Sequence, residues 1–144
     1  MDALDLLKND HQRVSELFDQ LQQAEDIDQK RDIFELIRDE LTAHADIEEH
    51  YFYPVFADKE GFEDLIDESL DDHAEMKDLI EEIDSLDDES ELQDRFDELQ
   101  EVVDEHVTEE EHELFPKVRK VLDEAALAKL GEEIMAAKAP PRAA

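Results

Sequence analysis

A single motif occurs twice in this chain. Residues 44–54 read HADIEEHYFYP and residues 106–116 read HVTEEEHELFP, so a histidine, a glutamate four residues later, a second histidine and a proline recur at the same offsets. A shift of 62 residues relates the two copies, and the same shift relates His11 to His73. A repeat of this length that occurs twice favours two copies of one helical hairpin over a solenoid of many short units.

Apolar residues follow the repeat of an α-helix in four segments. They recur in steps of three and four residues, the spacing that places side chains on one face of a helix. The four stripes are Leu4, Leu7, His11, Val14, Phe18 and Leu21; Ile33, Ile37, Leu41, His44, Glu48, Tyr51 and Val55; Phe62, Ile66, Ser69, His73, Met76, Ile80 and Ile83; and Phe96, Leu99, Val103, His106, Glu110 and Glu113. We predict an all-α fold, an up-down-up-down four-helix bundle with a pseudo-twofold internal repeat and a short C-terminal fifth helix over EAALAKLGEEIMAAK.

The chain length and composition fit one such domain. At 144 residues the chain can bury a hydrophobic core, and 40% apolar residues with two glycines and four prolines suit helices better than sheets. We place the domain at residues 1–137, with hairpins over 1–57 and 61–122, and a flexible tail at 138–144. We expect Pro54 and Pro116 to kink or end their helices, because proline lacks a backbone N–H and clashes with the preceding turn.

The net charge limits the partners. Against 14 Lys and Arg, 46 Asp and Glu give a formal charge of −32, which repels the phosphates of nucleic acid and of anionic lipid. We therefore expect neither nucleic acid nor a membrane as a partner. The first residues lack the basic segment and apolar run of a signal peptide, so we expect a cytoplasmic location. The acidity fits both cation attraction and adaptation to a salt-rich cytoplasm.

The doubled motif has the spacing of a metal clamp. Residues four apart lie one above the other on a helix face, so His44 and Glu48 point in one direction, as do His106 and Glu110. The helix lengths bring these residues and the other two stripe histidines to one depth in the bundle. The predicted ligands are His11, His44, Glu48, His73, His106 and Glu110. Buried carboxylates and imidazoles are costly unless a cation compensates them, so we predict a metal site.

The ligand types favour iron. The chain has no cysteine, so nitrogen and oxygen must hold the metal. Histidines with carboxylates suit iron, manganese or zinc, and two histidines plus a carboxylate per metal with open positions favour non-haem iron. We expect two iron ions, joined by an oxo or hydroxo bridge and spanned by both glutamates. From the pseudo-symmetry, His11 and His44 would hold one ion, and His73 and His106 the other.

Other polar residues of the two motifs divide into candidates and surface residues. Tyr51 and Glu113 stand three residues past the two glutamates, on the ligand side of their helices. Tyr51 is a candidate hydrogen-bond donor to a bound oxidant or a phenolate ligand, and Glu113 is a candidate further ligand. The alternative is a core tyrosine and a partly exposed carboxylate. His50 and His112 point away from the ligand face, so we place them on the surface.

These residues resemble the hemerythrin-like family of HHE cation-binding domains. The family pattern H…HxxxE…H…HxxxE corresponds here to His11, HADIE at 44–48, His73 and HVTEE at 106–110. The resemblance implies a four-helix bundle with a carboxylate-bridged di-iron centre that reacts with oxygen, peroxide or nitric oxide. Oxygen carriers of the family have a fifth histidine four residues past the one on the third helix. Here that residue is Lys77, which points away from reversible oxygen carriage.

Reaction with a small oxidant is the function that we expect. A small, dry, apolar pocket at the metals would admit a diatomic molecule or peroxide and exclude bulky substrates. Catalase-like disproportionation of hydrogen peroxide, or reaction with O2, is the first hypothesis. The alternatives are a non-catalytic module that senses or stores O2, nitric oxide or iron, and an acidic bundle without metal. A ferritin-like site needs two ExxH motifs, of which Glu109 with His112 supplies one, and the HExxH motif of zinc proteases does not occur.

Overall fold

Residues 1–138, the part of the chain that the structure describes, contain helices and no strand. The structure is a computed structural model, and residues 139–144 of the predicted tail lie outside the described part. The elements are α1 (Ala3–Gln23), α2 (Ile27–Ile47), η1 (Glu48–Phe52), α3 (Tyr53–Phe56), α4 (Glu63–Ser85), α5 (Glu89–Glu109), η2 (Glu110–Leu114), α6 (Phe115–Val121) and α7 (Glu124–Lys138). The label η marks a π-helical turn.

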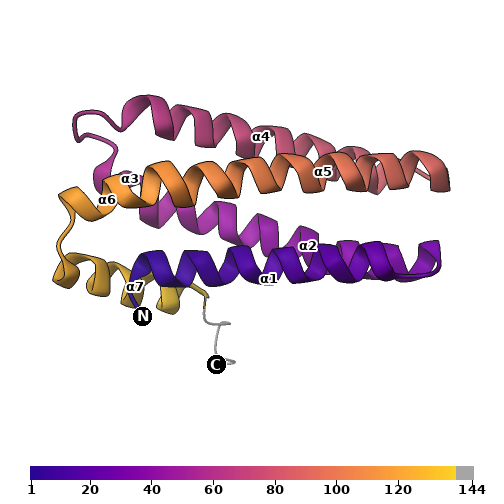
Figure 1. Cartoon of the computed structure of the whole chain (residues 1–144), viewed down its shortest axis with the longest axis horizontal. Helices are drawn as coiled ribbons and strands as arrows, with labels where there is room; N and C mark the ends of the chain where they lie inside the picture. The colour runs from indigo at the N-terminus through magenta and orange to yellow at the C-terminus, as the bar shows by residue number, and fades with distance from the viewer. Residues whose placement is uncertain (139–144) are drawn as a thin grey trace, which may run out of the picture.

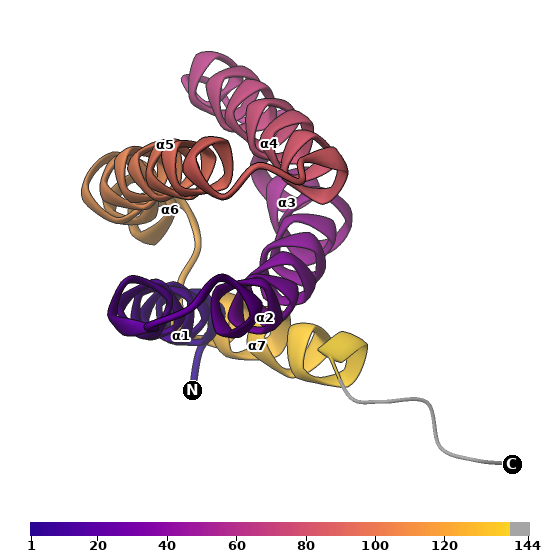
Figure 2. The same cartoon turned by 90° about the vertical axis from the view of Figure 1, so that its right-hand side faces the viewer.

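Four long helices form the bundle. α1 and α2 lie side by side as one hairpin and α4 and α5 as the other, and all four run along the long direction of the molecule (Figure 1). Seen from the end, the four helices surround a common interior, and α7 lies outside it against α1 and α2 (Figure 2). The predicted all-α fold and its fifth helix are therefore confirmed.

Aspartate side chains begin three of the long helices. Asp2, Asp26 and Asp88 have extended backbones, and each side chain accepts a hydrogen bond from the backbone N–H three residues later. Such a cap satisfies an amide that has no partner inside the helix. Before α4 the chain turns at Gly61, whose φ of 89° is a conformation that glycine adopts without strain. The aspartate caps and the glycine turn thus help to fix where the long helices begin.

A π-helical turn follows each HxxxE pair. In η1 the N–H of Tyr53 donates to the carbonyl of Glu48, five residues back, and the N–H of Phe115 bonds in the same way in η2. Pro54 and Pro116 come next. A wider turn before a proline moves away the carbonyl with which its ring would otherwise clash. The chain therefore stays helical through both prolines, and the expected break takes the form of a π turn.

The π turn changes which side chains face the core. Regular α-helical spacing predicts Tyr51 and Val55 on the buried stripe, but these residues are 43% and 39% exposed. Phe52, Tyr53 and Phe56 are buried instead. The reason is the additional residue that a π turn contains, which advances every later side chain around the helix. The predicted place of Tyr51 on the stripe is therefore wrong.

The core consists of two apolar clusters with a polar layer between them. The cluster near α3, α6 and α7 includes Leu4, Leu7, Phe52, Phe56, Phe62 and Phe115. The cluster toward the other end includes Val14, Phe18, Leu21, Phe34, Phe96 and Leu99. On α1, His11 follows Leu7 of the first cluster and precedes Val14 of the second. The predicted ligands therefore occupy a level with apolar packing above and below.

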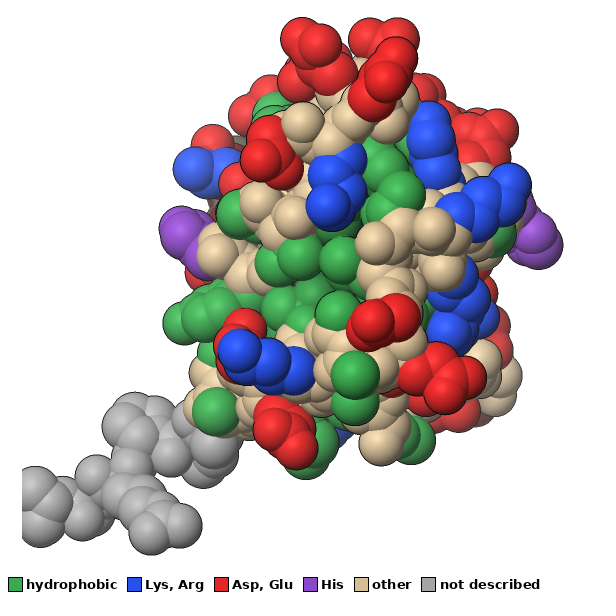
Figure 3. All heavy atoms as spheres, turned by 90° about the vertical axis from the view of Figure 1, so that its left-hand side faces the viewer, with side chains coloured by type: hydrophobic (Ala, Val, Ile, Leu, Met, Phe, Trp, Pro, Cys, Tyr) green, Lys and Arg blue, Asp and Glu red, His purple; other side chains and the backbone are tan. Residues whose placement is uncertain are grey.

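The surface is not uniformly acidic. Figure 3 looks at the end of the bundle that carries α3, α6 and the start of α7, where hydrophobic side chains are bordered by Lys and Arg. The short helix α6 contains Lys117, Arg119 and Lys120. Within residues 1–138, no helix is both long enough and apolar enough to cross a membrane.

Gly131 allows α7 to lie against the start of α1. A Cβ at this position would come within 2.8 Å of the Met1 carbonyl oxygen and 3.0 Å of the Ala3 nitrogen. Gly131→Ala should therefore lower the free energy of unfolding by about 1–3 kcal/mol, the usual cost of overpacking. Helix propensity alone would raise it by about 1 kcal/mol. Urea denaturation measures the sign of the change in the free energy of unfolding. Ala128→Gly, on the exposed face of α7, gives the effect of helix propensity alone. A more stable Gly131→Ala protein would contradict the close packing.

Candidate metal centre

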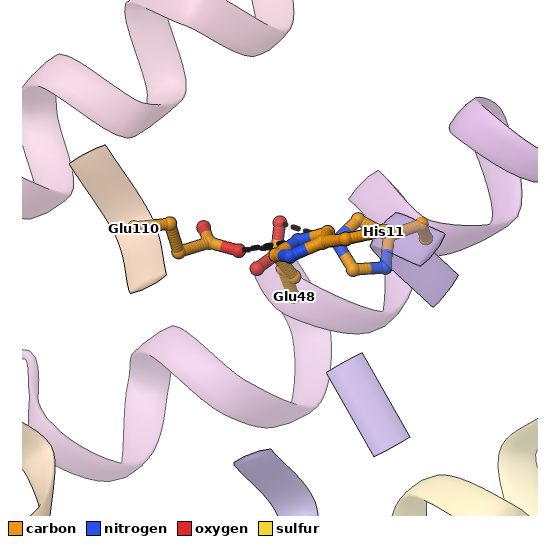
Figure 4. Close-up of side chains that lie close together, drawn as sticks. His11, Glu48 and Glu110 are labelled. Carbon is orange, nitrogen blue, oxygen red and sulfur yellow. Dashed lines mark hydrogen bonds and ion pairs between the residues drawn. The ribbon is translucent and has the colours of Figure 1, made fainter. Parts of the chain in front are cut away.

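Four histidines and two glutamates meet between the two apolar clusters. Each long helix contributes one histidine and each π turn begins with one glutamate: His11, His44, His73, His106, Glu48 and Glu110. All six are at most 8% exposed. Figure 4 shows His11 pointing toward the carboxylates of Glu48 and Glu110. The structure thus brings together the six residues that the sequence places in one layer.

One group of ligand atoms forms around α1 and α2. His11 Nε2 lies 3.0 Å from Glu110 Oε1 and 3.2 Å from His44 Nε2. His44 Nε2 lies 3.2 Å from Glu48 Oε1. These four residues offer nitrogen and oxygen atoms that all lie within 4.8 Å of one another. They can surround one metal ion.

A second group forms around α4 and α5. His73 Nε2 lies 3.1 Å from Glu48 Oε1. His106 Nε2 lies 3.3 Å from Glu110 Oε2 and 3.9 Å from Glu48 Oε1. Glu48, His73 and His106 again offer ligand atoms within 4.8 Å of one another. Glu48 belongs to both groups, so the two positions are adjacent.

A carboxylate holds each of the four histidines at its other nitrogen. The Nδ1 atoms of His11, His44, His73 and His106 lie 2.6, 2.9, 3.0 and 2.9 Å from oxygens of Glu111, Asp10, Glu49 and Asp72, respectively. A carboxylate at Nδ1 fixes the ring orientation and leaves Nε2 free for a metal, as is usual around metal-bound histidines. Asp10 also pairs with Lys138, which ties the end of α7 to the site. Four such pairs direct four Nε2 atoms into one layer.

The sequence prediction did not include these four outer carboxylates. The 62-residue shift relates Asp10 to Asp72 and Glu49 to Glu111, so the repeat itself contained the signal. Among 46 acidic residues, however, a carboxylate beside a histidine does not stand out. Their role becomes visible only when the helices are placed side by side.

The layer contains buried polar atoms that the protein does not satisfy. Glu48 Oε2, Glu110 Oε1 and His106 Nε2 are buried and make no hydrogen bond of regular geometry among residues 1–138, although His11 Nε2 lies 3.0 Å from Glu110 Oε1 and His106 Nε2 lies 3.3 Å from Glu110 Oε2. Unpaired buried groups cost free energy unless something binds them. Cations placed between the carboxylates and imidazoles would bind such atoms directly. The donor set and its unpaired atoms therefore fit a metal.

Without a metal, the glutamates favour protonated histidines. Burial acts to lower the pKa of His106, but the nearby carboxylates of Glu110 and Glu48 outweigh burial and raise this pKa to about 11. Burial is likewise outweighed at His44, where Glu48 and Asp10 hold the pKa well above its usual value. The pKa of Glu110 is lowered despite its burial, because it accepts hydrogen bonds from this layer. A metal that enters must displace protons from the imidazoles.

Tyr53 makes the two halves of the layer unequal. Its hydroxyl donates to Glu110 Oε2 at 2.8 Å, and its ring stacks on His73 with 5.8 Å between centroids. Phe115, 62 residues later, stacks on His11 at 6.0 Å but has no hydroxyl. Burial and the two nearby carboxylates raise the pKa of Tyr53, so it stays a hydrogen-bond donor. The repeat is thus broken at the hydroxyl that donates to Glu110.

The remaining candidates of the two motifs lie outside the layer. Tyr51 and Glu113 are exposed and belong to neither ligand group. After the π turn, Tyr53 takes the inward place that regular helical spacing assigned to Tyr51, and Glu113 is carried outward in the same way. His50 and His112 are exposed, as expected.

Comparisons with known proteins agree with this geometry. Residues 2–118 match the family described as Hemerythrin HHE cation binding domain. The chain belongs to this family. A protein of Nostoc sp. (strain PCC 7120 / SAG 25.82 / UTEX 2576) named "DNA nickase" is 35% identical over 139 residues, which are 96% of this chain and 39% of that protein. The chain thus spans about two fifths of the length of this relative. No solved structure matches the chain.

Family membership and the buried cluster together identify a metal-binding protein of the HHE type. The two ligand groups are the candidate site, and the ligand roles of the individual residues stay predictions.

The metal-free domain should be most stable at mildly acidic pH. Histidines with a raised pKa stabilise the fold fully below about pH 6.5 and lose this contribution as the pH rises through the folded value. Glu110, with a lowered pKa, contributes above about pH 4.5 and loses its contribution as the pH falls. Urea denaturation at high salt, which screens the surface charge, should give a higher free energy of unfolding at about pH 5.5 than at about pH 9. A profile that is flat across this range would contradict the proposed charge balance.

Tyr53→Phe should destabilise the metal-free domain by about 2 kcal/mol, because it removes a buried hydrogen bond to a charged group. Phe115→Tyr is the matched change in the other half. It should be less costly or even stabilising, since it offers a donor on the side where Glu48 Oε2 has none. Urea denaturation of both variants measures the difference. Equal losses in the two would show that only ring packing matters.

Proposed function

We propose that this domain holds two iron ions in the buried layer and reacts with small oxidants, hydrogen peroxide first and O2 second. The observation that carries the proposal is the pair of ligand groups that share Glu48. Groups that share a carboxylate suit two metal ions about 3.5–4 Å apart. Imidazole and carboxylate ligands without thiolate suit iron. Pairing of His11 with His44, and of His73 with His106, follows the same two groups.

A small cavity beside the histidines supports a small substrate. Its volume is about 20 Å³, and all four histidines line it together with Asp10 and the apolar residues Val14, Leu41, Ala45, Met76, Val103 and Val107. This is room for a single molecule the size of water, or for one slightly larger if the side chains yield. The apolar walls exclude bulk water, which favours peroxide or a diatomic molecule over a larger organic substrate.

Peroxide disproportionation needs no other reagent. Two molecules of hydrogen peroxide give two of water and one of O2: one molecule gains two electrons and two protons, and the other loses them. Bound iron would supply and accept the electrons. The chain contributes the positions of the groups: the outer carboxylates orient the imidazoles, and the Tyr53 hydroxyl donates a hydrogen bond to Glu110 Oε2.

A non-catalytic module that senses or stores O2, nitric oxide or iron is the second candidate. The same two ligand groups support it, because a buried pair of metal ions can also bind a small molecule without turnover. The activity named for the Nostoc relative is not part of the proposal. A domain with a charge of −32 repels the DNA backbone.

Metal content tests the site. Protein produced in iron-replete cells should contain about two irons per chain, and His73→Ala should lose about half of that iron because it removes one ligand of one position. His112→Ala is the matched control, since this histidine is exposed on η2. Equal iron in both variants would contradict the assignment of His73, and a folded wild-type protein without metal would contradict the whole site.

Adding hydrogen peroxide to the iron-loaded protein separates the two candidates. Evolved O2, measured with an oxygen electrode and absent in His73→Ala, would support disproportionation. A changed optical spectrum without evolved O2 would support the sensing or storage role.

A further inference from the structure

A surface groove between α2 and α4 reaches the wall of the metal layer. The groove has a volume of about 670 Å³ and is open to solvent. Leu41, Ala45, His73 and Met76 line this groove and also the small cavity inside the bundle. One layer of side chains therefore separates solvent from the four histidines at this point, and one of these side chains is itself a predicted ligand.

We infer that small oxidants reach the metal layer through the groove between α2 and α4, and that Ala45 and Met76 set the width of this port. The inference deepens the proposed function and rests on it in one respect, that a metal occupies the layer. The ligand set determines neither the route by which an oxidant enters nor the residues that select oxidants by size.

The internal repeat shows why the port would lie on this side. The 62-residue shift relates Ala45 to Val107 and Val14 to Met76. Ala45 and Val107 are both half-buried, and both line the inner cavity. At this position the wall of the cavity on α2, at Ala45, therefore has two carbon atoms fewer than the wall on α5, at Val107. Met76 is unbranched with several rotatable bonds, whereas valine is stiff at χ1. A small residue beside a flexible one can open a passage that two valines keep closed.

The lining of the groove suits neutral molecules. Its charged residues are Arg38, Lys77, Asp46, Glu49 and Glu81, so cations and carboxylates are mixed rather than segregated. An anion would also meet the field of a chain with a charge of −32, while hydrogen peroxide or a diatomic gas would not. Lys77, which stands where oxygen carriers of the family have their fifth histidine, is exposed and belongs to this groove instead of the layer.

Two matched leucine variants test the port. Ala45→Leu fills the wall shared by the groove and the cavity, and Ala43→Leu makes the same change at an exposed position of α2 that lines neither of them. The measurement is the stopped-flow rate constant for nitric oxide binding to the ferrous protein, which needs no turnover, with iron content determined in parallel. We expect Ala45→Leu to slow binding by about tenfold, the factor that a barrier raised by about 1.4 kcal/mol produces. Ala43→Leu should leave the rate unchanged.

A variant at the edge of the groove distinguishes a blocked entry route from a distorted metal layer. Ala74 is exposed and lines the groove but not the inner cavity. Ala74→Leu should slow nitric oxide binding with normal iron content, and Gln12→Leu, at the repeat-related position, should not. Equal slowing by Ala45→Leu and Ala43→Leu, or unchanged rates in both groove variants, would overturn the port while the metal site stands. Iron-loaded wild-type protein that fails to bind nitric oxide would also overturn it, and a wild-type protein without iron would overturn the proposed function with it.

Discussion

The carboxylates of Glu48 and Glu110 face each other in the centre of this bundle, and both are at most 1% exposed. Two negative charges at that depth are tolerable only when opposite charges surround them. Four imidazoles surround them, and the pKa of each is raised by the nearby carboxylates, which favours the charged form in the metal-free protein. Four further carboxylates hold the outer nitrogens of those imidazoles. The bundle must therefore bring four helices to one depth, and the apolar clusters on either side keep water from the layer.

The π turns connect the backbone to this layer. Each begins at a buried glutamate, Glu48 or Glu110, and is followed by an aromatic residue and a proline. Because the turn contains one additional residue, it places Tyr53 and Phe115 over His73 and His11. The two rings cover the imidazoles from the side of the first apolar cluster. A regular α-helix would have left these stacking positions to other side chains.

Much of this could be predicted from the sequence, because the features involved are periodic. Helical spacing and the 62-residue repeat give the bundle, its hairpins and the six residues of the layer. The π turns could not be predicted in this way, since helical spacing counts a constant number of residues per turn, and Tyr51 was therefore expected where Tyr53 lies. The outer carboxylates were missed for another reason. In a chain with 46 acidic residues, only the packing of neighbouring helices distinguishes Asp10 or Glu49 from solvated surface.

The covalent joining of the two hairpins affects how such a centre can change. In a symmetric dimer of one hairpin, each substitution would appear on both sides of the axis. In a single chain the two halves are free to diverge, as they have at Tyr53 and Phe115 and at Ala45 and Val107. A hydroxyl or a methyl group can be gained on one side while the other side keeps its original environment. Joining two hairpins in one chain thus permits one ligand group to specialise while the other is kept.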